Sequence, residues 1–181
     1  MQILRDVAVL SEIISEPITL SEAKNYLRVD YSEDDALITA LITSARVRLE
    51  QYAGVAMTER TLQVIAYVDD LIELPYVPIS TILSVEYFDG QDWVTLEDGS
   101  YTVIGINYKK ISTLYYPSME YRFTYNCGYC EPPSSMRTAV FKLLSDLYEY
   151  RESSVESTKP NSNVVTAYEL MKPFKRINIF I

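Results

Sequence analysis

The sequence predicts an α+β fold in which helices from both ends of the chain form a helical bundle with an inserted antiparallel β domain. Apolar residues recur at three- and four-residue spacing near both ends of the chain, as they do on amphipathic helices. Between them lie short segments rich in β-branched and aromatic residues. Neither helical part can bury its apolar face alone, so the two should pack together. We therefore expect an N-terminal helical part at 1–58, a β domain at 59–131, and a C-terminal helical part with a tail at 132–181.

Two helices are predicted in the N-terminal part. Thr19 and Glu22 have the spacing of a capping box, which starts a short helix over about 20–28. Ser32 and Asp35 repeat this arrangement ahead of a helix of roughly twenty residues, which Gly54 can end in a left-handed cap. The apolar face of this second helix consists of Leu37, Ile38, Leu41, Ile42, Ala45, Leu49 and Tyr52.

The middle of the chain predicts a meander of about seven strands. Asp89-Gly90 and Asp98-Gly99 are hairpin-turn signals, and Pro75 and Pro78 indicate an edge or a corner between strands. The predicted strands are 61–68, 71–75, 82–88, 93–96, 101–104, 111–116 and 121–125.

Helical spacing returns after Pro132-Pro133. A helix should start near Ser134 and stop near Arg151, with Met136, Val140, Leu143, Leu144, Leu147 and Tyr148 on its apolar side. Residues 152–163 are polar and lack periodicity, which indicates a loop. A short helix over about 165–172 then precedes a tail at 174–181.

Composition excludes several classes of function. The chain has 181 residues, 48% of them hydrophobic, and a net charge of −9, which argues against a surface that grips nucleic acid by neutralising phosphates. No apolar run approaches the roughly 20 residues that span a bilayer, and no secretion signal is evident, so we expect synthesis in the cytoplasm and no membrane partner. The sequence has no histidine, which excludes His-based triads and His-based metal sites.

Cys127 and Cys130 form a C-x-x-C motif, which can be a redox dithiol or half of a zinc site. A redox pair of the thioredoxin type would start a helix in an α/β fold, and a zinc site would need two further ligands. We therefore interpret the pair as ordinary thiols.

The acidic clusters 33–35 and 69–70 could bind a divalent cation. A helix start explains the first cluster, since carboxylates there complement the helix dipole, and a solvated turn explains the second. We predict no catalytic, cofactor-binding or metal-binding residues, and no enzyme.

Sixteen tyrosines are explained mainly by the preference of tyrosine for strands. For Tyr115, Tyr116, Tyr121 and Tyr125, a role in subunit contacts is the alternative.

The chain resembles the head-tail connector (adaptor) proteins of tailed bacteriophages along nearly its whole length. The first residues of the resemblance are Leu20-Ser-Glu-Ala-Lys-x-x-Leu-Arg-Val-Asp30, Glu33-Asp-Asp35 and Glu50-x-Tyr-x-Gly54. It continues in Leu74-Pro-x-x-Pro78, Asn126-Cys-Gly-Tyr129, Leu147-Tyr-Glu-Tyr-Arg151 and Glu169-Leu-Met-Lys-Pro-Phe-Lys175. The segments 2–16 and 177–181 depart from the family pattern.

The resemblance implies a structural protein of the virion neck. Family members form a ring of about twelve copies below the portal protein, and such rings need head-to-tail contacts between copies. The ring provides a platform for a stopper or tail-completion protein, and DNA passes through it without sequence-specific binding. The negative charge suits this role, because carboxylates repel the DNA backbone. A monomeric phage protein-protein interaction module is the alternative.

The tail is the predicted contact with the portal protein or a neighbouring subunit. It is apolar and partly alternating, so it could dock by adding a strand to a sheet. Packing of the tail on its own helical bundle is the alternative. The candidate residues are Phe174, Lys175, Arg176, Ile177, Ile179, Phe180 and Ile181.

Overall fold

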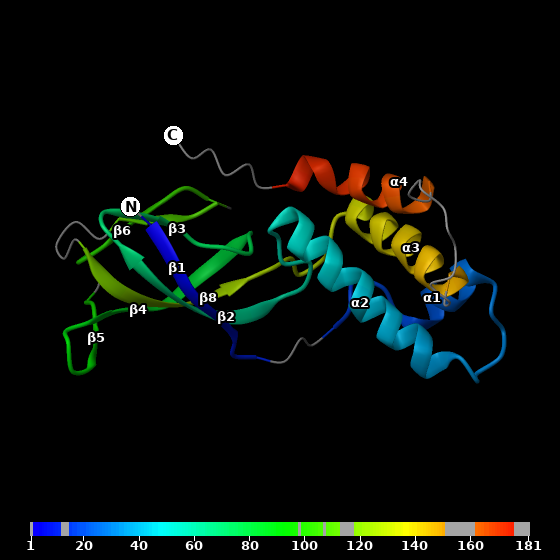
Figure 1. The fold of residues 1–181 in the computed structure, drawn as a ribbon, viewed down its shortest axis with the longest axis horizontal. Coiled ribbons are helices and arrows are strands. Elements are labelled where there is room, and N and C mark those ends of the chain that lie inside the picture. Colours follow the sequence, from blue (N-terminus) through cyan, green and yellow to red (C-terminus); the bar gives the residue numbers. More distant parts are fainter. Residues whose placement is uncertain are drawn as a thin grey trace. The chain divides into compact units, whose positions relative to one another are not determined.

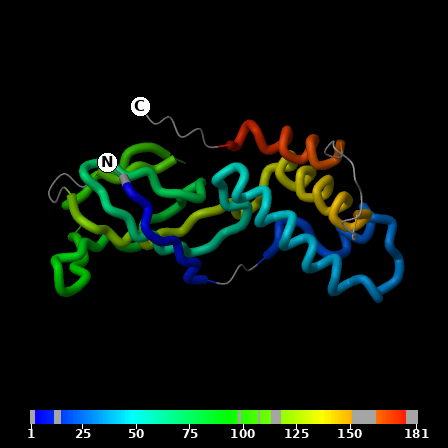
Figure 2. Tube along the Cα trace, viewed as in Figure 1, coloured from blue at the N-terminus to red at the C-terminus, as the bar shows by residue number. Residues whose placement is uncertain are grey.

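The computed structural model describes residues 2–11, 15–97, 99–106, 108–112, 118–150 and 162–175. The chain divides into two compact units: a β unit, Met1–Ile14 with Thr58–Cys130, and a helical unit, Ser15–Met57 with Glu131–Ile181. Figure 2 shows this division along the chain, since the helical unit combines blue-to-cyan and yellow-to-red segments. Each unit therefore contains segments that are distant in the sequence.

The helical unit contains four described α-helices. They are α1 (Leu20–Leu27), α2 (Asp35–Ala53), α3 (Ser134–Glu149) and α4 (Ser162–Met171), and a 3-10 turn, Lys172–Phe174, follows α4. Helix α3 contacts each of the other three helices, and α2 also contacts α1 and α4 (Figure 1). Burying each large apolar side chain contributes about 1.5–3 kcal/mol to folding. The core of this unit includes Ala23, Ile38, Ile42, Leu49, Met136, Val140, Leu143, Leu144, Ala167 and Met171.

The ends of α1 and α2 follow the predictions in part. The capping box of Thr19 and Glu22 is confirmed, and Gly54 ends α2 with a φ of 69° and an N–H bond to the Glu50 carbonyl. The prediction of a second capping box from Ser32 and Asp35 is wrong. The N-cap of α2 is Asp34, and its side chain makes no capping hydrogen bond.

Glu22 also receives a hydrogen bond from the Arg137 guanidinium of α3. The Thr19 backbone N–H, which donates to Glu22 at 2.8 Å, and then Arg137 hold the pKa of the Glu22 carboxyl below its ordinary value. A lowered pKa in the folded state stabilises the fold above the unfolded pKa, and this stabilisation is lost as the pH falls through the folded pKa.

Replacing Glu22 with glutamine is therefore expected to destabilise the protein at pH 7 and to have a smaller effect at pH 3. Urea unfolding of both proteins at the two pH values measures this difference. An equal cost at both pH values would contradict the role of the carboxylate charge.

The β unit contains two antiparallel sheets. The five-stranded sheet has the order β1-β2-β8-β4-β5, and the three-stranded sheet has the order β3-β7-β6. The strands are β1 (Gln2–Val9), β2 (Arg60–Val68), β3 (Leu71–Glu73), β4 (Ile79–Phe88), β5 (Trp93–Thr95), β6 (Thr102–Ile104), β7 (Lys110–Ser112) and β8 (Met119–Cys127).

The predicted meander is wrong as a topology. In the described sheets β8 lies between β2 and β4, so each of these two strands pairs with the distant β8 as well as with one sequence neighbour. Both β2 and β8 alternate part-buried and buried residues after their first residue, and their pairing in register places the buried residues of both strands on one face.

Strand β8 supplies the largest side chains of the β-unit core. Tyr121, Phe123 and Tyr125 are buried, and the Tyr125 hydroxyl donates to the Pro75 carbonyl at 2.7 Å. Burial rules out the subunit-contact interpretation for Tyr121 and Tyr125, whereas Tyr115 and Tyr116 lie outside the described residues. Ile72 and Ile111 of the three-stranded sheet are also fully buried.

The start of the chain corrects the assignment of 1–58 to a helical part. Residues Gln2–Val9 form β1, which pairs with β2, and they belong to the β unit. The pairing joins segments more than fifty residues apart, so no local pattern in 2–9 indicates it.

The turn predictions have mixed outcomes. Asp89 accepts from the N–H groups of Gln91 and Asp92, both at 2.8 Å, in the hairpin between β4 and β5, as predicted. The second hairpin, Asp98-Gly99, is wrong because β5 and β6 belong to different sheets, and Asp98 itself lies outside the described residues. The Pro75–Pro78 segment forms the predicted corner, since it joins β3 to β4 in the other sheet.

In the C-terminal part, α3 starts at Ser134 and ends at Glu149, close to its predicted limits. Helix α4 starts at Ser162, so it includes two residues that the sequence assigned to a loop. The rest of that predicted loop lies outside the described residues.

Candidate interaction site

Helices α2 and α4 carry a shallow groove where the tail begins. Arg48, Gln51 and Tyr52 of α2 line it together with Tyr168 of α4. The Tyr52 and Tyr168 rings pack with centroids 4.6 Å apart, and the Lys175 ammonium lies 4.5 Å from the centroid of the Tyr52 ring. This cation–π contact holds the start of the tail against the helical unit.

Only the first two predicted tail residues are described. Phe174 is half-buried and Lys175 is exposed. The other predicted contact residues, Arg176, Ile177, Ile179, Phe180 and Ile181, lie outside the described residues.

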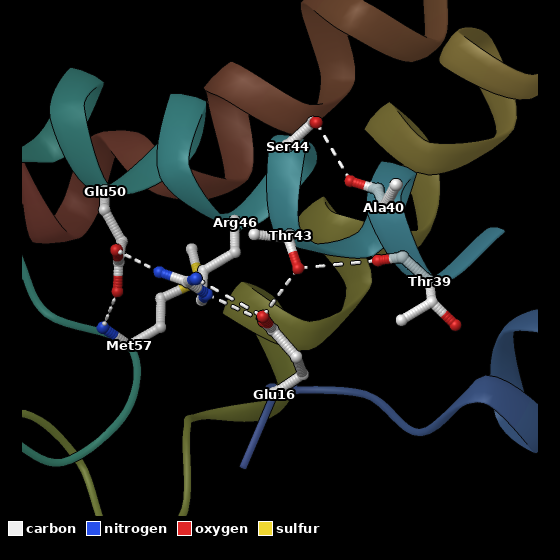
Figure 3. A network of polar contacts seen from close by, with 8 residues as sticks. All are labelled: Glu16, Thr39, Ala40, Thr43, Ser44, Arg46, Glu50 and Met57. Atoms are coloured by element: carbon white, nitrogen blue, oxygen red, sulfur yellow. Dashed lines mark hydrogen bonds and ion pairs between the residues drawn. The ribbon is translucent and has the colours of Figure 1, made fainter. Parts of the chain in front are cut away.

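A buried polar network fixes two connecting segments to α2 (Figure 3). The Arg46 guanidinium donates to Glu50 at 2.9 Å and to Glu16 at 2.7 Å, and Thr43 donates to Glu16 at 2.8 Å. The second oxygen of Glu50 accepts from the Met57 N–H at 2.7 Å. Arg46 and Glu50 are each only 3% exposed.

This network lies at the points where the chain enters and leaves the helical unit. Glu16 follows the unit boundary near residue 14, and Met57 is the last residue before the boundary at Thr58. Burial alone would lower the pKa of Arg46, but the hydrogen bonds and charges of Glu16 and Glu50 outweigh burial and raise it. Arg46 therefore stays charged and holds both connections to one helix.

Sequence reasoning missed this network. A usable signal was present, because Arg46 and Glu50 have i,i+4 spacing among the apolar positions of α2. Two opposite charges at core-facing positions indicate a buried ion pair. Their partners Glu16 and Met57 could not be inferred, because only the fold brings them to α2.

The acidic clusters make contacts within the protein. Asp34 accepts from the hydroxyls of Tyr31 and Tyr148, and Asp35 pairs with Lys24. Asp69 accepts from the Ser118 hydroxyl at 2.8 Å, and Asp70 accepts from Ser112 at 3.3 Å. Among the described residues, no three carboxylate, thiol or imidazole groups gather to form a site for a metal ion.

The two cysteines form no disulfide and lie in different surroundings. Cys127 is buried at the end of β8, and Cys130 is exposed. The two-proline segment separates them from α3, so neither thiol lies at a helix N-terminus.

Within the described part of the chain, no helix is both long and apolar enough to cross a bilayer.

Residues 17–87 match the family model of phage gp6-like head-tail connector proteins. This segment of the chain is similar to that family. The matched segment contains α1, α2, β2, β3 and most of β4, as well as the members of the Arg46 network other than Glu16. No curated protein matches the chain.

Solved structures share the fold of this protein over nearly the whole chain. A chain of the neck of an empty gene transfer agent particle, computed with C6 symmetry, has a TM-score of 0.77, 14% identity and 97% coverage of both chains. A chain of the virion of a native gene transfer agent particle has a TM-score of 0.78, 16% identity and 96% coverage of both. A chain of the neck of a native particle, computed with C12 symmetry, has a TM-score of 0.73, 14% identity and 97% coverage of both. At these identities the similarity establishes a common fold that includes both units.

Proposed function

We propose that this protein is a structural connector of the virion neck, which forms a ring of about twelve copies below the portal protein. The observation that carries the proposal is the full-length similarity to chains of gene transfer agent necks and virions, joined to the family match at 17–87. The C6 and C12 symmetries of those necks support a ring, and a ring of twelve copies is compatible with both symmetries. In this role the protein holds other proteins in place and performs no catalysis.

In this proposal the ring contacts the portal protein on one side and a stopper or tail-completion protein on the other. The segment Phe174–Ile181 provides an assembly contact with the portal protein or a neighbouring subunit. The helical unit, a bundle of helices from 15–57 and 131–181, provides the base from which this segment extends.

The charge distribution supports passage of DNA without tight binding. The β unit has twelve Asp and Glu residues against five Lys and Arg, whereas the helical unit has thirteen against eleven. The β unit therefore carries −7 of the net charge of −9. A surface of this charge repels the phosphate backbone and lets a duplex slide past.

The proposal is tested by mixing the purified protein with the portal protein encoded in the same genome. Co-sedimentation, followed by imaging of a ring stacked coaxially on the portal, is the expected result. A folded protein that stays monomeric and ignores folded portal rings would favour a protein-protein interaction module instead.

Removing residues 177–181 is expected to abolish ring assembly on the portal while the thermal unfolding midpoint stays within a few degrees. All described helices and strands remain in this shortened chain, so folding should persist. Co-sedimentation measures the first effect and circular dichroism the second. Normal assembly of the shortened, folded protein would rule out the role of the tail.

A further inference from the structure

Strand β1 forms one edge of the five-stranded sheet and pairs only with β2 among the described strands. The Leu10 N–H donates to the Thr61 carbonyl at 2.9 Å, so these residues form a hydrogen-bonded pair. Such pairs alternate along an antiparallel ladder. The continuous register from Asp6 to Val9 therefore directs the N–H and C=O groups of Val7 and Val9 away from β2, toward the open edge.

One of these outward groups is already bonded. The Asp6 carboxylate accepts from the Val7 N–H at 2.8 Å. The Val9 N–H has no hydrogen-bond partner within the described part of the chain. An edge with such groups can accept a further strand.

The side chains at this edge continue the core face of the sheet without being covered. Leu4 is opposite Ala66, and Val9 is opposite Leu62, and both partners on β2 are buried. Leu4 is nevertheless 47% exposed and Val9 57% exposed. The buried core layer therefore ends at β2, and the exposed side chains of Leu4 and Val9 form an apolar margin along β1.

The sequence after Lys175 has the properties of a strand that fits this margin. Ile177, Ile179 and Ile181 alternate with two other residues, so an extended segment would place all three on one face. This face would continue the core layer beyond Leu4 and Val9. This sequence begins with Arg176 and closely follows Lys172 and Lys175, and the β unit is strongly acidic.

We propose that residues 176–181 of one copy add as a strand to the β1 edge of a second copy. The proposal rests on the proposed function, because a closed ring needs head-to-tail contacts between two different surfaces. The helical unit carries the donor segment and the β unit carries the acceptor edge, so each copy has one of each. Backbone hydrogen bonds supply affinity, and the isoleucine side chains supply specificity.

Engineered disulfides test this arrangement directly. One full-length variant carries Val9→Cys and a second carries Ile179→Cys, both with Cys130→Ser to remove the exposed native thiol. On oxidation of the mixture, a covalent heterodimer is expected, both in rings on the portal and in concentrated free protein. In a matched control, Tyr26→Cys takes the place of Val9→Cys. Tyr26 lies on α1 and is 42% exposed, and this control should give no heterodimer.

A second pair of variants isolates the backbone contact. Val9→Pro removes the outward N–H without touching the β1–β2 ladder, whereas Val9→Thr keeps it in a β-branched residue. In otherwise native chains, Val9→Pro is expected to weaken association between copies about tenfold and Val9→Thr to have little effect, because one hydrogen bond is lost. Equal association of both variants, each with a native unfolding midpoint, would overturn the proposal.

The outcomes separate this inference from the proposed function. Rings on the portal without the inter-copy disulfide would overturn the inference and leave the connector role intact. A disulfide within one chain carrying both cysteines, unaffected by dilution, would also overturn it, because the tail would then cover its own edge. Inter-copy disulfides without any binding to the portal would support the inference and contradict the proposed function.

Discussion

Replacing Arg46 with methionine is expected to lower the free energy of unfolding by about 3–5 kcal/mol. The change keeps most of the apolar stem but leaves Glu50, which is 3% exposed, without the cation that compensates its charge. It also removes the ion pair that ties Glu16 to α2. Urea unfolding at neutral pH measures the loss.

Arg48→Met provides the matched control, because Arg48 lies two residues further along the same helix and is exposed. This variant should change stability by less than about 0.5 kcal/mol. A second variant, Glu50→Gln, keeps an oxygen that can accept from the Met57 N–H while removing the buried charge. The double variant of Arg46→Met and Glu50→Gln should therefore cost less than the sum of the single changes. A cost of Arg46→Met no larger than that of Arg48→Met would contradict the structural role of the network.

Replacing Gly128 with alanine is expected to cost more than the same change at Gly90. The two glycines have nearly the same backbone conformation, with φ of +107° and +105°. A Cβ at Gly128 would lie 2.1 Å from the Thr58 carbonyl oxygen, whereas a Cβ at Gly90 would meet nothing within 4 Å. Both variants carry a conformational cost of about 1–3 kcal/mol, and only Gly128→Ala must also move the backbone of Thr58, for about 1–3 kcal/mol more.

Thermal and urea unfolding of the two variants measure the difference directly. Because the conformational cost is shared, the difference isolates the close approach of the chain at Gly128 to the chain at Thr58. Equal destabilisation of both variants would show that this approach is not tight in solution.

Much of the fold could be predicted where the determining contacts are local. The capping box of Thr19 and Glu22, the left-handed cap at Gly54 and the turn at Asp89-Gly90 depend on residues within a few positions of each other. Helices α2 and α3 could likewise be predicted, because their apolar spacing is continuous. These features are set by short-range sterics and hydrogen bonds, so a sequence pattern is sufficient.

The strand order and the buried network could not be predicted in the same way. The pairing of β8 with both β2 and β4 joins segments that are more than thirty residues apart, and several strands had a suitable pattern of alternation. The edge at β1 depends on a partner beyond two intervening helices. The C-x-x-C motif shows that a local pattern needs its context, because Cys127 is buried at the end of β8 whereas Cys130 is exposed.

The division of the chain also determines the order in which the protein can fold during synthesis. Residues up to Cys130 contain all the strands that the structure describes, so the β unit can be complete once this point has left the ribosome. Helices α1 and α2 are made earlier, but their apolar faces must wait for α3 and α4. Domains generally fold as units while synthesis proceeds at about 5–20 residues per second. The first helices therefore spend several seconds exposed on the nascent chain, which is when a chaperone would have most to protect.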